Sequence, residues 1–293
     1  MLWYVLRACY EAGCTKVMVV VGHGKDEIIA TFADDDRITW IEQDQQLGTG
    51  HAALACANHL KNYHGDVFIL NADAPLVRGE ALRTLLAAHH EDRAVASLAT
   101  SIMDNPSGWA RIIRDAKGDF VSIVSEAEAT DQQRTVREIF PSYYCVNSKD
   151  LCHALAKLTK ATRNHEYNLV DIYQVLREEK KHIAAVQAVA PEDTFTVNTR
   201  QHLAEVDLIM QDRIQRQLRD SGVTIVSGFN TYVEIGASVG RETVVHPFTF
   251  IGRDSTIGTD CVIGPFARIP RDSVVPEGTS VLGHPPQDTI SKI

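Results

Sequence analysis

Segments with helical and with strand periodicity alternate along the first two hundred residues. Apolar side chains at Leu2, Val5 and Leu6 recur at helical spacing, whereas residues 17–21 (VMVVV) form a continuous apolar strand. The elements expected next are a helix at 25–33, a strand at 38–43, a helix at 51–60, a strand at 67–73 and a helix at 80–90. This βαβ order predicts an α/β, Rossmann-like domain with a mixed, mostly parallel sheet.

The stretch 94–150 is richer in strand-forming residues than the segments before it. Runs with strand character lie at 94–100, 110–115, 119–125 and 142–147. They predict a subdomain inserted on the substrate side of the sheet. Further on, apolar residues between 201 and 219 recur every three or four positions. This spacing predicts an amphipathic helix that ends at Gly222 and connects two domains.

The last part of the chain repeats with a period of six residues from Thr231 onward. The third residue of each hexad is β-branched: Val233, Val239, Val245, Ile251, Ile257, Ile263, Ile269, Val275 and Val281. We expect this residue to point inward from a short strand and the next one, often Gly or Pro, to turn the corner. The pattern resembles the left-handed β-helix of many acyltransferases, in which three hexads make one coil. Nine hexads would then make three coils.

These patterns divide the chain into an α/β domain at 1–200, a connector at 201–228 and a short C-terminal left-handed β-helix at 229–293. β-Helices of this type commonly pack as trimers, which implies a homotrimer. The net charge of −9 argues against nucleic acid as a partner, because no basic surface would meet the phosphates.

Six cysteines are scattered without metal-binding spacing, which is typical of small buried side chains in a reducing compartment and makes a structural zinc site improbable. No apolar stretch is long enough to span a membrane, and the start of the chain does not have the pattern of a signal peptide. We therefore expect a cytoplasmic protein with no membrane partner.

The stretch 68–77 (FILNADAPLV) places a carboxylate at the end of an apolar strand. Pro75 ends the strand and leaves Asp73 at its mouth, where open α/β sheets bind their ligands. A plainer interpretation makes Asp73 a turn residue before Pro75 and Thr49 the N-cap of a helix.

Four motifs occur in a fixed order ahead of the hexads: EQDQQLGTGHAA at 42–53, LNADAPLV at 70–77, NPSGWARIIR at 105–114 and TVNTR at 196–200. Together they resemble the sugar-1-phosphate nucleotidyltransferases, in particular the bacterial bifunctional uridyltransferase/acetyltransferases that make UDP-N-acetylglucosamine, a cell wall precursor. The resemblance covers almost the whole α/β domain and the first coils of the tail.

The resemblance implies roles for individual residues. Gln43, Gly48 and Thr49 align with uracil contacts, and Asp73 and Asn198 align with the two protein ligands of a catalytic Mg²⁺. The remaining candidate substrate contacts are Gln46, Asn71, Ala110 and Glu126. The implied reaction joins UTP and N-acetylglucosamine 1-phosphate, or a related hexosamine 1-phosphate, to give UDP-sugar and pyrophosphate. Asp73 would be the catalytic residue, acting through the metal without a covalent intermediate.

The sequence departs from the family at several points. The opening strand and its loop G-x-G-T-R-M, followed by a Lys, have no counterpart here. Ala110, Ser125 and Phe140 replace the usual Gly, Glu and Asn on the sugar side, and Glu126 could substitute for the lost carboxylate. From this we expect weak catalysis, a reading frame that starts upstream of Met1, and strands 17–21 and 67–73 without their shared central partner.

Two further hypotheses remain. The protein could bind a nucleotide sugar or UTP without turnover, having kept the uracil and metal contacts. It could also be a hexapeptide acyltransferase that uses acetyl-CoA, with His246 or His284 as general base, although a His on a coil surface is usually solvated or packed. Pyrophosphate release and acetyl-CoA consumption would separate these alternatives.

Overall fold

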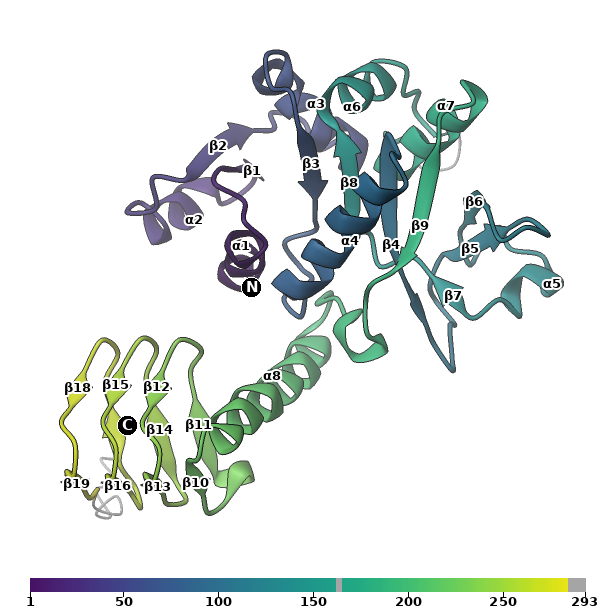
Figure 1. The fold of residues 1–293 in the computed structure, drawn as a ribbon. Helices are drawn as coiled ribbons and strands as arrows, with labels where there is room; N and C mark the ends of the chain where they lie inside the picture. The colour runs from purple at the N-terminus through teal and green to yellow at the C-terminus, as the bar shows by residue number, and fades with distance from the viewer. Residues whose placement is uncertain (162–164, 284–293) are drawn as a thin grey trace, which may run out of the picture. The chain divides into compact units, whose positions relative to one another are not determined.

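The protein consists of two compact units, Met1–Asn198 and Thr199–Ile293, in a computed structural model that describes residues 1–161 and 165–283. The first unit has α/β architecture and the second is a helix followed by a β-helix (Figure 1). The helix expected as a connector, α8 (Arg200–Asp220), falls in the second unit, where it packs on strands of the first coil. Among the described residues, no helix is long and apolar enough to cross a membrane.

The first unit alternates helices and strands as the periodicity predicted. Its helices are α1 (Leu2–Glu11), α2 (Lys25–Thr31), α3 (Thr49–Leu60), α4 (Gly79–Glu91), α5 (Asp131–Arg134), α6 (Ser148–Leu155) and α7 (Ile172–Glu178), with 3-10 turns η1 (Leu169–Asp171) and η2 (Pro191–Asp193). Its strands are β1 (Val17–Val21), β2 (Ile38–Glu42), β3 (Asp66–Ile69), β4 (Ala96–Ile102), β5 (Arg111–Arg114), β6 (Phe120–Val124), β7 (Glu138–Ile139), β8 (Tyr144–Asn147) and β9 (Ile183–Gln187).

These strands form two sheets. β1 pairs with β2 in parallel, and the larger sheet runs β3-β8-β4-β7-β5-β6, with β9 parallel to β4. The larger sheet is mixed, as predicted, but most of its pairings are antiparallel because β8 returns between β3 and β4 and β5-β6 is a hairpin. Within the described parts of the chain, β1 has β2 as its one partner and β3 has β8, and the two sheets share no strand.

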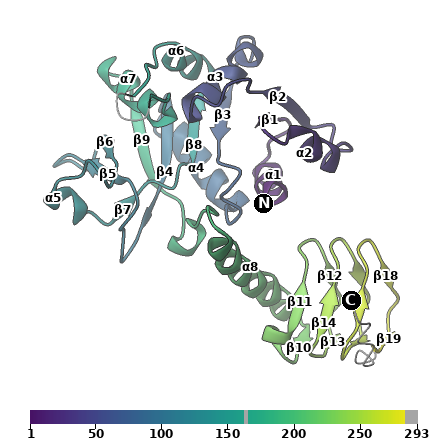
Figure 2. The same ribbon diagram turned by 180° about the vertical axis from the view of Figure 1, so that it is seen from behind.

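Apolar side chains cover the larger sheet on both faces. One cluster joins α3, α6 and α7 to β4 and β8 through residues such as Leu98 and Val146, and the other joins α1 and α4 to the opposite face through Ala99 and Cys145. Figures 1 and 2 show these helices on their two sides of the sheet. Successive strand residues point to opposite faces, so the continuous apolar runs read from the sequence belong to a sheet that is buried on both sides.

The second unit stacks very short strands into coils of eighteen residues. They are β10 (Thr224–Ile225), β11 (Thr231–Val233), β12 (Ser238–Val239), β13 (Val244–Val245), β14 (Thr249–Ile251), β15 (Thr256–Ile257), β16 (Val262–Ile263), β17 (Arg268–Ile269), β18 (Val274–Val275) and β19 (Ser280–Val281), with the 3-10 turn η3 (Gly228–Asn230). They form three parallel sheets, and Thr231 pairs with Thr249 one coil later. The third hexad residues from Val233 to Val275 are all buried, which confirms the predicted left-handed β-helix.

Most left-handed residues of the coils are the sixth of a hexad, with φ between 55° and 85° at Gly236, Glu242, Phe248, Asp254, Asp260, Phe266, Asp272 and Gly278. The fourth position favours glycine for a different reason, since a Cβ on Gly240 or Gly258 would lie 2.5 Å from backbone of the next coil. At Gly264, the residue after the inward Ile263, the backbone is left-handed as well, with φ of 89°.

Candidate functional site

Asp73 lies in the loop between β3 and α4, at the strand end where the sequence predicted a ligand. The buried run Ala74–Val77 anchors this loop in the core. The Oδ1 atom of Asp73 is buried and accepts no hydrogen bond from the described residues, and burial raises the pKa of this carboxyl. A buried carboxylate oxygen with free lone pairs is suited to a cation, because a cation would compensate the lost hydration.

The second expected metal ligand lies in a neighbouring backbone segment. The N–H of Val197 donates to the carbonyl oxygen of Asp73 at 2.8 Å, which places the segment of Asn198 beside the Asp73 loop. The amide nitrogen of Asn198 donates to Thr196 Oγ1 at 3.3 Å. No group of three His, Cys, Asp or Glu side chains gathers as a metal site in the described residues. A cation here would rely on one carboxylate, one amide oxygen and ligands from water or substrate, as Mg²⁺ commonly does.

The expected uracil contacts follow β2. The N–H of Gln43 donates to Val21 O at 2.9 Å, which extends the pairing of β1 and β2 by one residue. The Gln43 side-chain nitrogen lies 2.9 Å from His51 Nδ1 and donates to Gly48 O at 3.4 Å. Gln46 lies against Gly22, where a Cβ would be 2.8 Å from its amide nitrogen. The loop is therefore ordered by its own polar groups.

The segment 167–169 is hydrogen-bonded to this loop. Gly50 N donates to Tyr167 O at 2.7 Å, Tyr167 N donates to Leu47 O at 2.8 Å, and Leu169 N donates to Thr49 Oγ1 at 3.0 Å. Gly48 is the N-cap of α3, so Thr49 does not act as the helix cap that the plainer interpretation proposed. Tyr167 was not among the predicted site residues, because no local periodicity marks its position.

We expect Gly48→Ala to destabilise the protein. Gly48 has φ of 101°, and a Cβ would lie 2.7 Å from Tyr167 O. Strain and the displaced segment together should lower the free energy of unfolding by about 2 to 4 kcal/mol, measured by urea denaturation. Gly118→Ala is the matched control, since Gly118 has φ of 89° with nothing within 4 Å. Equal losses in both variants would contradict a role for the Tyr167 contact.

Glu126, one of the residues expected to contact the sugar, forms contacts with other residues of the protein. Its carboxylate lies 2.7 Å from Nη2 of the buried Arg111 and accepts from the N–H of Gly108 at 3.3 Å. The carbonyl of Ala110 accepts from the N–H of Phe140 at 3.1 Å, and the Phe140 ring packs edge-on against two buried tyrosines. Thus the position that carries an Asn in the family contributes a buried ring to the core here.

The remaining predicted residues are placed as follows. The carbonyl of Asn71 accepts from Ala74 N at 3.3 Å and shapes the turn that carries Asp73. The N–H of His246 donates to Ile263 O at 2.8 Å within the β-helix, while His284 lies outside the described residues. The structure thus brings Asp73 next to the segment of Asn198, and gathers Gln43, Gly48 and Thr49 in one loop.

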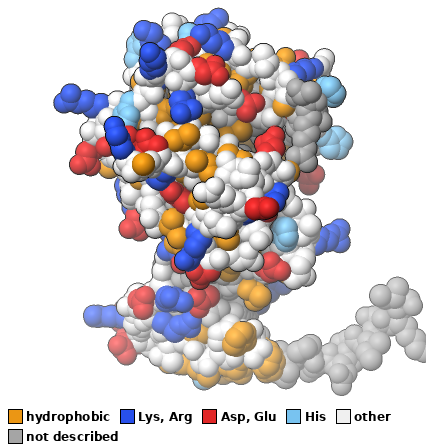
Figure 3. Space-filling view, turned by 90° about the vertical axis from the view of Figure 1, so that its right-hand side faces the viewer, with side chains coloured by type: hydrophobic (Ala, Val, Ile, Leu, Met, Phe, Trp, Pro, Cys, Tyr) orange, Lys and Arg blue, Asp and Glu red, His pale blue; other side chains and the backbone are white. Residues whose placement is uncertain are grey.

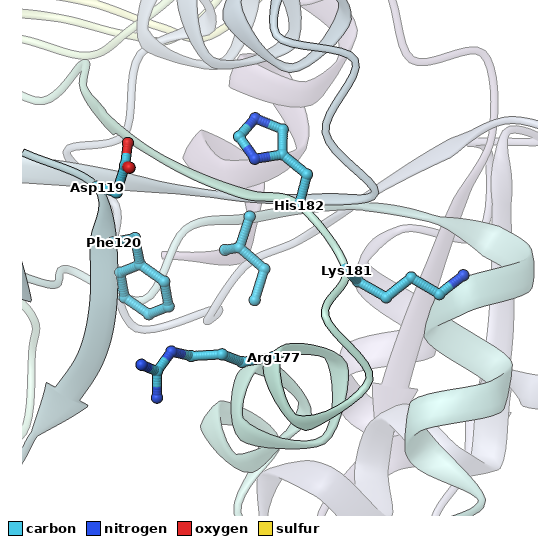
Figure 4. A pocket seen from close by; sticks show the side chains of 6 residues that line it. Asp119, Phe120, Arg177, Lys181 and His182 are labelled. Carbon is cyan, nitrogen blue, oxygen red and sulfur yellow. The ribbon is translucent and has the colours of Figure 1, made fainter. Parts of the chain in front are cut away.

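A hollow of about 200 Å³ lies elsewhere in the first unit, between the start of β6, the end of α7 and the start of β9 (Figure 4). It is lined by Asp119, Phe120, Arg177, Lys181, His182 and Ile183, none of which is a predicted site residue.

Charged side chains of both signs are interspersed on the face shown in Figure 3. That face has no continuous basic surface of the kind that binds nucleic acid.

Residues 1–167 match the MobA-like NTP transferase domain, and residues 236–271 match the bacterial transferase hexapeptide (six repeats). The chain is 36% identical over 247 residues to the "Bifunctional protein GlmU" of Geotalea daltonii, which covers 84% of this chain and 54% of that protein. It is 35% identical over 251 residues to the protein of the same name from Geobacillus sp. strain WCH70, covering 86% and 54%. The chain spans about half the length of the curated relatives it matches.

Among solved structures, the chain resembles UDP-glucose pyrophosphorylase, both complexed with UDP-glucose and in the apo form. The TM-scores are 0.51 and 0.50, with 15% and 17% sequence identity. The complex covers 63% of this chain and 76% of that chain. At such identity the similarity concerns the fold alone.

Proposed function

The chain belongs to the MobA-like NTP transferase family and carries hexapeptide repeats behind that domain, and from this premise we propose that it transfers uridylyl from UTP to a hexosamine 1-phosphate. N-acetylglucosamine 1-phosphate is the first candidate acceptor, because the GlmU relatives match both units of the chain. The products would be UDP-sugar and pyrophosphate.

The buried Oδ1 of Asp73, which has no partner among the described residues, carries this proposal. Asp73 and Asn198 would hold a Mg²⁺ that offsets the charge of the phosphates. Gln43 would bind the uracil ring with its amide, which His51 already orients at 2.9 Å. Gly48 leaves room for the Tyr167 segment, and the loop that this segment holds would need little reorganisation on binding.

Pyrophosphate release by the full chain tests the proposal. The chain is incubated with UTP, Mg²⁺ and either N-acetylglucosamine 1-phosphate or another sugar 1-phosphate. We expect release that needs both Mg²⁺ and an acceptor sugar. Release without an acceptor sugar, or none with any acceptor, would contradict it.

A second candidate function is binding of a nucleotide sugar without turnover. Two residues at the expected sugar-binding positions favour it. Glu126 forms an ion pair with Arg111 and Phe140 is buried in the core, so neither side chain is free to contact a sugar. Mg²⁺-dependent binding of UDP-N-acetylglucosamine in calorimetry, combined with absent pyrophosphate release, would select this alternative. Consumption of acetyl-CoA would instead select the acyltransferase hypothesis for the hexapeptide unit.

We further propose that the second unit assembles as a trimer. Phe248 and Phe266 occupy left-handed corners of successive coils, where their rings stack at 5.1 Å and stay 56% and 38% exposed. A left-handed conformation costs about 1 to 2 kcal/mol for a residue with a Cβ, and Asp or Asn tolerates it better than Phe. Exposed aromatic rings kept at such positions favour a contact with another copy of the chain.

Replacing both Phe248 and Phe266 by Asn should therefore dissociate the trimer without harming the coil. Light scattering at micromolar concentration should give the mass of one chain for the variant and of three chains for the parent. The left-handed corners should become about 1 kcal/mol more favourable each. Asp260→Asn, at an equivalent corner, serves as the control and should stay trimeric. An unchanged oligomer in the double variant would place the contact elsewhere.

A further inference from the structure

Helix α1 ends in a hydrogen-bonding pattern that brings two cysteines together. Gly13, with φ of 97°, follows the helix, and its N–H donates to Tyr10 O at 3.0 Å. The N–H of Cys14 donates to Cys9 O at 3.0 Å. These two bonds define the Schellman motif, in which the side chains five positions apart across the helix end usually make an apolar contact. In this chain both of those side chains carry a thiol.

This helix end places the two free thiols at adjacent positions. The neighbouring Cys14 thiol, followed by burial, raises the pKa of Cys9, and the neighbouring Cys9 thiol lowers the pKa of Cys14. Cys9 is buried and Cys14 is partly exposed. Reagents therefore reach Cys14 first, and Cys14 is also the thiol that ionises more readily.

The other cysteines lack this combination. Cys56 and Cys152 have carbonyl oxygens as thiol partners, at 3.8 Å each, and burial raises the pKa of Cys56 to about 11. Cys145 lies in the same apolar cluster as Cys9 but is fully buried. Cys261 is buried inside the β-helix. The helix end thus holds a pair that differs from an ordinary buried thiol.

We propose that Cys9 and Cys14 form a reactive dithiol site, which hydroperoxides oxidise to a disulfide and trivalent arsenicals bridge. The Cys14 thiolate attacks the outer oxygen of a hydroperoxide and forms a sulfenic acid as the O–O bond breaks. The alkoxide that leaves takes a proton from solvent and becomes an alcohol, or water when the oxidant is hydrogen peroxide. The Cys9 sulfur then attacks the Cys14 sulfur, and the hydroxyl leaves as water with the Cys9 proton. An arsenoxide instead loses its oxygen as water while arsenic bonds both sulfurs.

The site touches the part of the fold that carries Asp73. A Cβ on Gly79, at the start of α4, would lie 2.6 Å from Glu11 Cβ, and Arg83 Nη1 donates to Glu11 O at 2.6 Å. Cys9 shares its apolar cluster with Ala74 and Val77, which follow Asp73. A covalent link at the end of α1 would therefore fix the helix against which the Asp73 loop packs.

Phenylarsine oxide tests the site in the full, reduced chain. We expect one arsenical per chain and the loss of two thiols from alkylation, recovered with a dithiol competitor. Cys14→Ser should lose this uptake, while Cys152→Ser, which removes an isolated half-exposed thiol, should retain it. Uptake that persists in Cys14→Ser, or that disappears in Cys152→Ser, would overturn the proposal.

Peptide mapping after hydrogen peroxide tests the oxidation in the unaltered sequence, and it decides the matter if Cys14→Ser fails to fold. The expected product is a peptide containing both Cys9 and Cys14, lighter by two hydrogen atoms and restored by reductant. A Cys14 that proceeds to sulfinic acid beside a free Cys9 would overturn the proposal, and so would a link from Cys14 to Cys145.

Discussion

Asp73→Asn should abolish Mg²⁺-dependent binding of UDP-sugar and lower pyrophosphate release by about 10³-fold or more. The substitution removes the carboxylate in the strand-end loop and leaves only neutral oxygens to meet the cation. Calorimetric titration with and without Mg²⁺ measures the first effect. Asp92→Asn, at an exposed carboxylate after α4, is the matched control and should behave as the parent. Equal affinity of the Asp73 variant and the parent, each with Mg²⁺, would remove Asp73 from the site.

The same substitution should make the protein without metal more stable at neutral pH. Burial raises the pKa of Asp73 in the folded state above 3.8, the ordinary value that we take for the unfolded chain. At any pH above the folded-state pKa, the ionised carboxylate therefore lowers the free energy of unfolding. This penalty decreases as the pH falls through the folded-state pKa and disappears below 3.8. The urea midpoint of Asp73→Asn should therefore exceed that of the parent at pH 7, with the difference lost near pH 3.5. Added Mg²⁺ should stabilise the parent alone.

Glu126→Gln should destabilise the protein by about 2 to 3 kcal/mol. Arg111 is only 1% exposed, and its ion pair with Glu126 spans 2.7 Å. Removing one partner of a buried pair costs about 3 to 5 kcal/mol, and the 36% exposure of the Glu126 side chain reduces that figure through solvent screening. Urea denaturation measures the loss, which should be accompanied by loosening of the loop that Glu126 holds at Gly108.

This prediction separates two roles for Glu126. If it contacts the sugar, as the resemblance implies, Glu126→Gln should raise KM for the sugar 1-phosphate and leave stability unchanged. Glu128→Gln is the control, because Glu128 is an exposed neighbour bonded to Ser125 Oγ at 2.6 Å. A double variant, Arg111→Met with Glu126→Met, should recover part of the stability, since no uncompensated charge then remains buried. Failure of the double variant to recover any would point to a packing role for the Arg111 side chain.

The candidate site was only partly readable from the sequence. Asp73 could be found because a carboxylate after an apolar strand, followed by proline, is a local signal. Its position beside the segment of Asn198 depends on the bond from Val197 N to Asp73 O, which joins residues far apart along the chain. The hydrogen bonds of Tyr167 to the loop after Gln43 and the ion pair of Glu126 with Arg111 could not be predicted from the local sequence.

The sequence by itself determined the periodic parts of this protein. A period of two, of 3.6 or of six records which side chains are buried, so α1 to α4, α8 and the hexads of the β-helix could be predicted from spacing, whereas α5, α6 and α7 were not predicted. The tertiary structure decided what depends on approach between distant segments. It set the two sheets, the antiparallel return of β8, the left-handed corners at residues such as Phe248, and the contact of Cys9 with Cys14. Periodicity shows which side chains are buried, whereas the strand or side chain that each one contacts depends on the fold of the whole chain.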